Sequence, residues 1–183
     1  MLQKVERFPR MLEEAYKIGA DFDASQFGEI RQAVLFGMGG SAVGGDFLRC
    51  CAYDQARIPI SVVRGYTVPN SVDCHTLAIL CSYSGNTEET LSCYEQAIQK
   101  KAQILCITSG GKVEKLAKEH GHPLLKIPGG LPPRSALGYS FAPLLRVFER
   151  LGLTPNQENS LREAVDVLDE CVNLFGGTVL SDN

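Results

Sequence analysis

The stretch TLAILCSYSGNTEET (residues 76–90) joins an apolar run to a polar turn and then to the start of a helical pattern. Its apolar residues are continuous rather than alternating, which is typical of a strand buried on both faces of a parallel sheet. The helical pattern that follows covers about residues 87–100. This stretch therefore predicts one strand–turn–helix unit.

The rest of the chain repeats that unit. Further apolar runs predict strands, at 33–37, 58–63, 103–108 and 123–127. Helical patterns lie between or after the runs, at about 41–53, 112–120 and 135–151. Repeated strand–helix units need right-handed crossovers, so we expect a doubly wound α/β sheet. Pro143 falls inside the last of these helices and predicts a kink.

The composition narrows the class of protein. Of 183 residues, 44% are hydrophobic, and the net charge is −3, which predicts a packed core rather than disorder. The sequence has no long basic block, no apolar run near the ~18 residues of a membrane span and no signal-peptide core. We therefore expect a cytoplasmic protein that binds neither nucleic acid nor membranes.

The seven cysteines form no CxxC pair and show no metal-ligand spacing with the three histidines. We interpret the cysteines as reduced thiols and expect no metal ion and no cofactor. His75, His120 and His122 fall before a strand or after a helix. They should therefore lie at the amino edge of the sheet, away from a ligand, as structural or solvated residues.

The last helical pattern, at about 157–175, has an apolar stripe at three- and four-residue spacing. The stripe comprises Leu161, Ala164, Val165, Leu168, Cys171, Val172 and Phe175. Such a helix needs a surface to cover. The sheet, a second copy of the chain and a further domain are three alternatives, and we expect a homodimer.

Ligands of parallel α/β sheets bind at the carboxyl ends of the strands. The first loop there reads GMGGSAVGG (37–45), in which Ser41 is a candidate helix cap. Gly37, Gly39 and Ala42 also fit the dinucleotide pattern G-x-G-x-x-A, which would make the chain a nicotinamide-dependent dehydrogenase. That pattern requires an acid after the second strand, where this chain has Arg64, so we disfavour it.

The second loop is the polar turn SYSGNTEET (82–90). The hydroxyls of Ser82, Ser84 and Thr87 can converge on one point beside the amino end of a helix, which carries a partial positive charge. Such a turn can hold a phosphate without any cation. The alternative is ordinary helix capping by Asn86 or Thr87, in capping-box spacing from Asn86 to Glu89. Capping does not need Ser82 and Ser84, so we favour the phosphate.

Two further loops follow strands. TSGG (108–111) alone predicts only a turn. PGGLPPRSALGY (128–139) is stiffened by prolines and holds one cation, Arg134, just before a helix. A solvated surface arginine is the ordinary interpretation. A guanidinium held rigidly at a strand's carboxyl end can also stabilise a developing oxyanion.

The four motifs GMGGSAVGG, SYSGNTEET, ITSGG and PGGLPPRSALGY, in this order, resemble the bifunctional phosphoglucose/phosphomannose isomerases of the sugar isomerase (SIS) superfamily. The resemblance covers about residues 30–150. It implies a three-layer αβα sheet of five parallel strands in flavodoxin-like order and a hexose 6-phosphate ligand. It also implies an N-terminal helical arm (1–29), an SIS domain (30–153) and a C-terminal helix (154–183) that leads to a second domain.

The resemblance also implies roles for individual residues. Ser82, Ser84 and Thr87 match the family's phosphate ligands, and Gly40 and Ser41 match its substrate-contacting glycine and serine. Arg134 matches the arginine that stabilises the enediolate when a proton moves between C1 and C2. The family's glutamate base, histidine and lysine match no position here. We therefore expect the N-terminal half of an isomerase, or alternatively a phosphosugar-binding sensor without catalysis.

Overall fold

A computed structural model describes residues 5–176. Its centre is a five-stranded sheet, all parallel, with the order β2–β1–β3–β4–β5. The strands are β1 (Gln32–Phe36), β2 (Ile60–Val63), β3 (Thr76–Cys81), β4 (Gln103–Thr108) and β5 (Leu124–Lys126). The predicted doubly wound sheet in flavodoxin-like order is confirmed.

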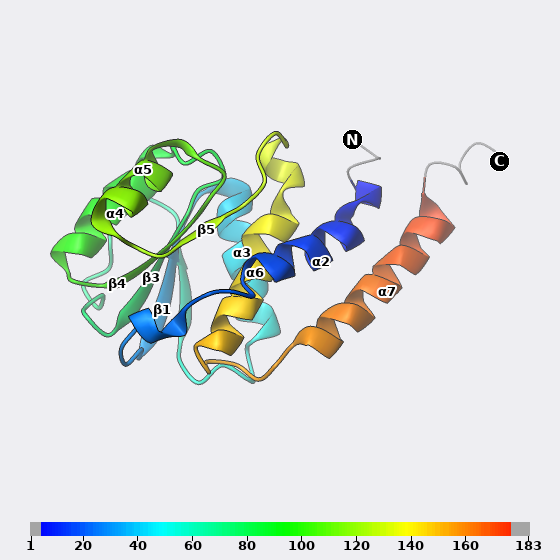
Figure 1. Cartoon of the computed structure of the whole chain (residues 1–183), viewed down its shortest axis with the longest axis horizontal. Helices are drawn as coiled ribbons and strands as arrows, with labels where there is room; N and C mark the ends of the chain where they lie inside the picture. Colours follow the sequence, from blue (N-terminus) through cyan, green and yellow to red (C-terminus); the bar gives the residue numbers. More distant parts are fainter. Residues whose placement is uncertain (1–4, 177–183) are drawn as a thin grey trace.

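Four helices cover the two faces of this sheet (Figure 1). They are α3 (Gly39–Cys51), α4 (Glu88–Gln99), α5 (Gly111–His120) and α6 (Leu137–Arg150). The side chains of α4 and α5 share one buried cluster with one face of the strands, whereas α3 and α6 share another cluster with the opposite face. The result is the three-layer αβα arrangement that the alternation of strands and helices predicts.

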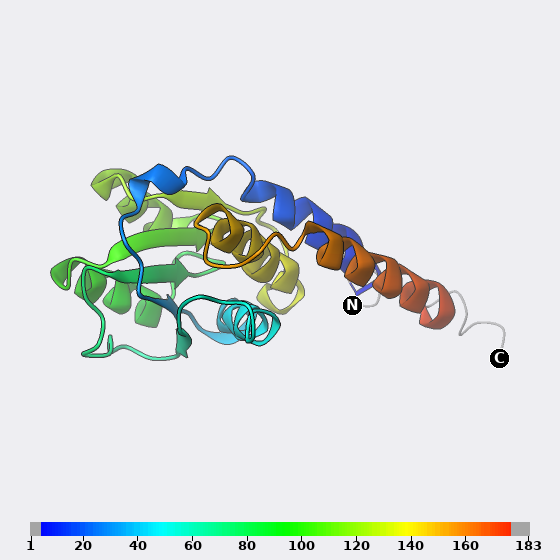
Figure 2. The same ribbon diagram turned by 90° about the horizontal axis from the view of Figure 1, so that it is seen from below.

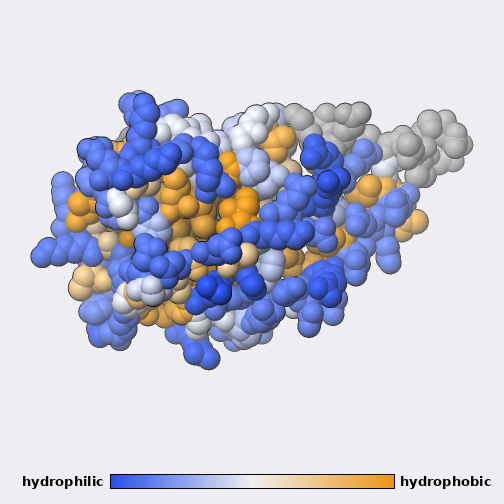
Figure 3. Space-filling model, viewed as in Figure 1, coloured by the Kyte–Doolittle hydropathy of each residue, from blue (hydrophilic) through white to orange (hydrophobic). Residues whose placement is uncertain are grey.

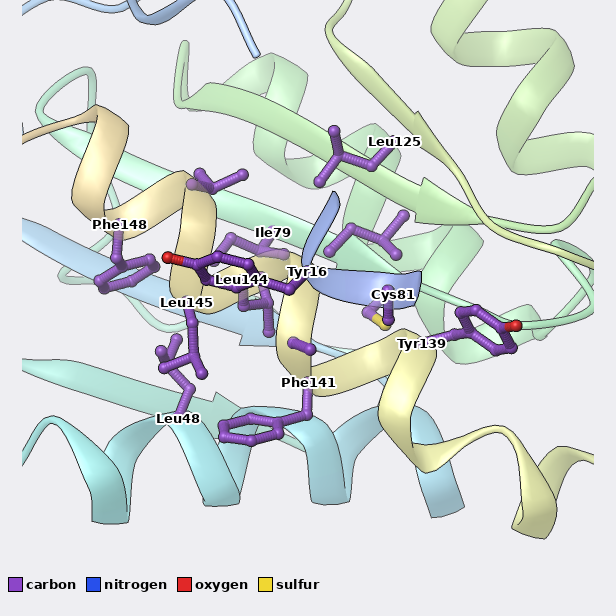
Figure 4. Packing of buried hydrophobic residues seen from close by; sticks show 14 of the residues in the cluster. Tyr16, Leu48, Ile79, Cys81, Leu125, Tyr139, Phe141, Leu144, Leu145 and Phe148 are labelled. Carbon is purple, nitrogen blue, oxygen red and sulfur yellow. The ribbon is translucent and has the colours of Figure 1, made fainter. Parts of the chain in front are cut away.

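The central strands are buried on both faces, as their continuous apolar runs predict. Every residue of β3 is buried. Leu77, Ile79 and Cys81 point toward α3 and α6, and Ala78 and Leu80 point toward α4 and α5. Figure 4 shows the cluster formed with α3 and α6, in which side chains of α6 pack between the sheet and Tyr16.

The helix α2 (Phe8–Ile18), followed by the short helix η1 (Ala24–Gln26), packs on the outer side of α6. Its buried residues include Met11, Leu12 and Ala15, which belong to the same cluster as the sheet. Residues 8–18 of the predicted arm thus contribute to the core. Residues 1–4 of that arm lie outside the described residues.

The last helix, α7 (Glu158–Phe175), lies beside α2 and extends away from the sheet (Figure 2). At its amino-terminal end Leu161 and Val165 are buried. Toward its other end Leu174 and Phe175 are exposed, and apolar surface is visible there in Figure 3. The apolar stripe therefore covers α2 in its first half rather than the sheet. Residues 177–183 lie outside the described residues.

Two local expectations need correction. The predicted helix at 41–53 begins two residues earlier, at Gly39, so Ser41 lies inside its first turn and does not cap it. The predicted strand at 58–63 begins only at Ile60, after Pro59, which has no N–H to donate to a ladder. Pro143 is buried within α6, which continues from Leu137 to Arg150.

None of the described helices is long and apolar enough to cross a lipid bilayer.

Candidate functional site

The strand order reverses between β1 and β3, which are neighbours in the sheet although β2 separates them in sequence. The chain leaves β1 toward α3 on one face and leaves β3 toward α4 on the other. In open parallel sheets such a switch point is where loops part and a ligand can enter. The β1 loop (residues 37–41) and the β3 loop (residues 82–87) meet there.

Within the β3 loop, the side chains of Ser82 and Thr87 are brought together. Their hydroxyl oxygens lie 2.9 Å apart and share a hydrogen bond. Ser82 is buried, and its Oγ also accepts the Gly85 N–H at 3.1 Å. Ser84 is exposed, and its Oγ accepts the Asn86 N–H at 3.2 Å. Two of the three predicted phosphate ligands are thus in contact, with the third on the exposed surface of the same loop.

The amino end of α4 opens onto this loop. Its N-cap residue is Thr87, which makes no side-chain capping bond. Asn86 does not cap α4 either, because its Oδ1 accepts the N–H of Lys112 in α5 at 3.1 Å. Thr87 thus occupies the N-cap position, as the capping alternative expected, but neither Asn86 nor Thr87 gives the first-turn N–H groups of α4 a side-chain cap.

The β3 loop and the β4 loop (residues 109–111) pack closely against each other because each has a glycine at the contact. Gly85 and Gly111 both have left-handed backbones, with φ of 69° and 73°. A Cβ on Gly85 would lie 1.7 Å from the carbonyl oxygen of Gly110, and a Cβ on Gly111 would lie 2.4 Å from that of Ser84. The motif TSGG alone predicted only a turn, because no short sequence pattern indicates a close approach between two separate loops.

Ser41 and Gly40 lie in the first turn of α3, next to the β3 loop. Ser41 is buried, and its Oγ accepts the N–H of Tyr83 at 3.2 Å. The carbonyl of Gly40 accepts a hydrogen bond from Ser140 Oγ of α6 at 3.1 Å. Glycine is needed at position 40, since a Cβ there would lie 2.9 Å from the carbonyl oxygen of Pro133. That contact brings the β1 loop against the chain after β5.

Arg134 belongs to that chain segment, the β5 loop (residues 128–135), which ends in the short helix η2 (Pro133–Ser135). The side chain is exposed and makes no ion pair with any residue between 5 and 176. It lines a mostly apolar groove of about 520 Å³ between α2 and α7, together with residues such as Phe8 and Leu168. Arg134 thus comes from a loop that contacts Gly40.

Three carboxylates lie near the β3 loop, those of Glu88, Glu89 and Glu114. The pKa of Tyr66 is raised chiefly by the neighbouring Glu89 carboxylate and also by Glu88, which places both acids near the chain after β2. Glu114 pairs with Lys118 and Lys126, and hydrogen bonds from these two lysines lower its pKa to about 2. Glu114 is thus a paired carboxylate, whereas Glu88 and Glu89 lie in the first turn of α4.

Histidines and thiols lie away from the loops or are chemically inert. His75 lies before β3, and the ring of His122, after α5, bonds the hydroxyl of Tyr94 at 2.7 Å. Both positions are at the amino edge of the sheet, as predicted. All seven cysteines are free, and burial raises the pKa of the Cys81 thiol to about 12. Among residues 5–176 no cluster of three potential metal ligands occurs.

Arg64, which stands where a dinucleotide-binding chain would have an acid, forms an ion pair with Asp46 of α3. Gly37 and Gly40 of the β1 loop serve packing, whereas a Cβ on Gly39, which has a φ of 50°, would meet no atom within 4 Å. A Cβ on Gly37 would lie 2.8 Å from the carbonyl oxygen of Cys81. The first glycine of the pattern that suggested a dinucleotide thus also has a packing explanation.

Comparison with curated proteins identifies relatives of this chain. The bifunctional phosphoglucose/phosphomannose isomerase of Caldicellulosiruptor bescii is 45% identical over 171 residues, which are 93% of this chain and 50% of that protein. The chain is a homologue of the bifunctional phosphoglucose/phosphomannose isomerases. The enzyme of that name from Thermoplasma acidophilum is 41% identical over 81% of the chain and 44% of its own length. The D-glucosamine-6-phosphate 4-epimerase of Sulfolobus acidocaldarius is 34% identical over 79% of the chain and 45% of its length.

Solved structures confirm the SIS fold. The C-terminal domain of glucosamine-fructose-6-phosphate aminotransferase from Francisella tularensis superposes with a TM-score of 0.68 at 16% identity, covering 93% of this chain and 53% of that one. Tagatose-6-phosphate ketose/aldose isomerase from Escherichia coli gives a TM-score of 0.64 at 20% identity, over 92% and 52% of the two chains. No family model matches the sequence. The chain spans about half the length of the curated isomerases that it matches.

Proposed function

We propose that this chain is the N-terminal, phosphate-binding half of a phosphosugar aldose–ketose isomerase. The substrates would be glucose 6-phosphate and mannose 6-phosphate, each converted reversibly to fructose 6-phosphate. In this proposal the chain binds the sugar phosphate, and the base that moves the proton belongs to the part of the isomerase relatives that the chain does not cover.

One observation carries the proposal, namely the hydroxyl pair of Ser82 and Thr87 at the uncapped amino end of α4. Helix N–H groups and hydroxyls together can hold a phosphate dianion, and the helix dipole adds favourable charge. Each bond to the charged group contributes about 1.5–3 kcal/mol net. A few such bonds give micromolar affinity after the cost of association.

The reacting end of the sugar is assigned to the opposite side of the switch point. Gly40 and Ser41 lie there, and the β5 loop with Arg134 contacts Gly40. When a proton leaves the carbon next to a carbonyl, negative charge develops on the oxygens. The Arg134 guanidinium, which forms no ion pair with residues 5–176, is suited to stabilise that charge.

Isomerisation also needs a positioned base, because a C–H proton next to a carbonyl is only weakly acidic. Glu88 and Glu89 lie near Tyr66, and Glu114 is paired with lysines. Arg134 cannot accept a proton at neutral pH. We therefore expect that residues 1–183 alone bind the substrate but do not turn it over.

The test combines calorimetry with a coupled assay for fructose 6-phosphate on the 183-residue chain. We expect saturable binding of glucose 6-phosphate, poor binding of glucose, and turnover at the background rate. Equal affinity for glucose and its 6-phosphate would contradict the phosphate assignment. An ordinary enzymatic rate would instead show that the chain contains a base.

The alternative function is a phosphosugar-binding sensor, which would bind equally well but never react. The relatives include both isomerases and a 4-epimerase acting on a hexosamine phosphate, which supports a common binding half combined with different reactions. An activity assay on a longer natural protein that contains these residues distinguishes the two functions. Turnover by that protein supports the enzyme, and its absence with intact binding supports the sensor.

We further propose a homodimer that acts in the cytoplasm in glycolysis and gluconeogenesis. The exposed apolar end of α7, with Leu174 and Phe175, supports association. Sedimentation velocity at tens of micromolar concentration tests this assembly, and a single monomeric species would contradict it.

A further inference from the structure

Tyr83 of the β3 loop connects its own loop to three others at the carboxyl edge of the sheet, those after β1, β4 and β5. Its N–H donates to Ser41 Oγ in the β1 loop at 3.2 Å. Its carbonyl accepts from both the N–H and the Oγ of Ser109 in the β4 loop, at 3.1 and 2.6 Å. Its hydroxyl accepts the N–H of Leu131 in the β5 loop at 2.9 Å.

The hydrogen bond to Leu131 differs from the other hydrogen bonds of the β5 loop, which are local. Three of the eight residues from 128 to 135 are prolines, which have no N–H. The other hydrogen bonds of this segment run within it or to Ala136, from Ser135 to Pro132 and from Ala136 to Pro133. Within residues 5–176, the Leu131–Tyr83 bond is thus the one hydrogen bond that ties the β5 loop to another loop.

Arg134 follows Leu131 by three positions, across the stiff pair Pro132 and Pro133. Because the ring of each proline fixes φ, holding the backbone of Leu131 in place also restricts the backbone position of Arg134. On the other side, Tyr83 lies between Ser82 and Ser84 of the predicted phosphate cradle. A single side chain thus links the predicted phosphate-binding loop to the backbone segment that carries Arg134.

We propose that Tyr83 is a positioning residue, whose hydroxyl holds Arg134 at the reacting end of a sugar phosphate that is bound by the β3 loop. This inference rests on the proposed function and deepens it. The hydroxyl itself need not touch the substrate. It would act by preorganising Arg134, since a charge that is already in place stabilises a developing oxyanion without reorganisation.

The experiment uses two ligands that share the phosphate but differ at the other end. Glucitol 6-phosphate is uncharged there, whereas 5-phospho-D-arabinonate carries a carboxylate that imitates the enediolate. We expect the 183-residue chain to prefer the arabinonate. Tyr83→Phe keeps both backbone contacts and should lower that preference about three- to tenfold, the value of one hydrogen bond. Its affinity for inorganic phosphate should stay unchanged.

Two controls make the result specific. Tyr94→Phe removes the hydroxyl of a buried tyrosine, which bonds His122 at the far edge of the sheet, and should leave the preference intact. In an Arg134→Ala background, Tyr83→Phe should have no further effect on the preference, since the two residues act as a unit. Amide exchange at Leu131 should accelerate in Tyr83→Phe, which shows that the bond is lost although the protein is folded.

The outcomes separate the inference from the proposed function. A wild-type preference in Tyr83→Phe, with faster exchange at Leu131, overturns the positioning role and leaves the proposed function standing. An equal loss of affinity for both ligands and for phosphate assigns Tyr83 to the phosphate loop instead and also overturns it. If neither phosphorylated ligand binds the wild-type chain, the proposed function itself is wrong.

Discussion

The hydroxyl of Tyr16 donates to the carboxylate of Glu149, 133 positions further along the chain, with oxygen–oxygen distances of 2.7 and 2.8 Å. The same carboxylate accepts from Arg146 at 2.8 Å and from the N–H of Gln157 at 2.9 Å. Glu149 thereby joins α2, α6 and the residue that precedes α7. The side-chain network is half-buried, so its loss should lower the free energy of unfolding of the whole protein.

The first prediction concerns stability at high pH. Burial, followed by the hydrogen bond to Glu149, raises the pKa of Tyr16 from 10.0 to about 12. The folded state therefore favours the protonated phenol. The resulting stabilisation is fully present below pH 10 and is lost as the pH rises to about 12.

Urea unfolding as a function of pH measures this effect. Tyr16→Phe should lower the free energy of unfolding at pH 7 and should reduce the loss of stability between pH 10 and 12. Tyr53→Phe is the matched control, because Tyr53 is 88% exposed. An unchanged alkaline slope in Tyr16→Phe would show that other groups determine the loss.

The fold was readily predicted from the sequence because burial leaves a local signature. The continuous apolar runs of β3 and β4 identified buried parallel strands, and strands buried on both faces require helices on both sides. Four motifs placed the loops at the carboxyl edge. In contrast, the ends of α3 and β2 were misplaced by about two residues, because the start of an element depends on its neighbours.

What the sequence did not predict is contact between loops. Asn86 has the spacing of a helix cap, yet its side chain bonds α5 instead of α4. Gly111 looks like an ordinary turn glycine, yet it faces the carbonyl of Ser84. Both outcomes depend on how close β3 and β4 are to each other. This distance is set by the folded sheet and cannot be predicted from a short sequence pattern.

The second prediction tests the interlock between the β3 and β4 loops. Gly111 and Gly121 both have left-handed backbones, with φ of 73° and 67°. Around Gly121 a Cβ would meet no atom within 4 Å, whereas around Gly111 it would clash with the β3 loop. Gly121→Ala should therefore cost only the backbone strain of about 1–2 kcal/mol.

Gly111→Ala should cost more than that and should also abolish glucose 6-phosphate binding, because the cradle must shift to relieve the clash. Thermal unfolding and calorimetry on both variants provide the comparison. If Gly111→Ala loses no more stability than Gly121→Ala and binds normally, the two loops do not constrain each other.

The third prediction concerns Arg134 in an active isomerase that contains these residues. Arg134→Ala should lower kcat by about 10²–10³, the scale of losing one oxyanion-stabilising donor. KM should change much less, since the phosphate is held by another loop. Arg10→Ala, which removes an exposed partner of Glu14, is the control. A large rise in KM with wild-type kcat would place Arg134 on the phosphate instead.

The fourth prediction separates the hydroxyls of the cradle by their neighbours. Ser82 is buried, and its Oγ bonds both Thr87 Oγ1 and the Gly85 N–H. Ser82→Ala removes both hydrogen bonds, at a cost of about 1–3 kcal/mol, while the Gly85 N–H keeps its bond to the backbone carbonyl of residue 82. The melting temperature of Ser82→Ala should fall by several degrees, at roughly 2–4 °C per kcal/mol for a chain of this size. Ser84 is exposed, so Ser84→Ala should melt like the wild type.

Binding should follow a different order from stability. The double variant Ser84→Ala with Thr87→Ala removes two hydroxyls at the open end of α4, and we expect its affinity for glucose 6-phosphate to fall more than about tenfold, the loss of at least one bond to a charged group. Ser61→Ala on the edge strand β2, which is also exposed, is the control for a lost serine hydroxyl. Unchanged phosphate affinity in the double variant would remove the β3 loop from the binding site, whatever its effect on melting.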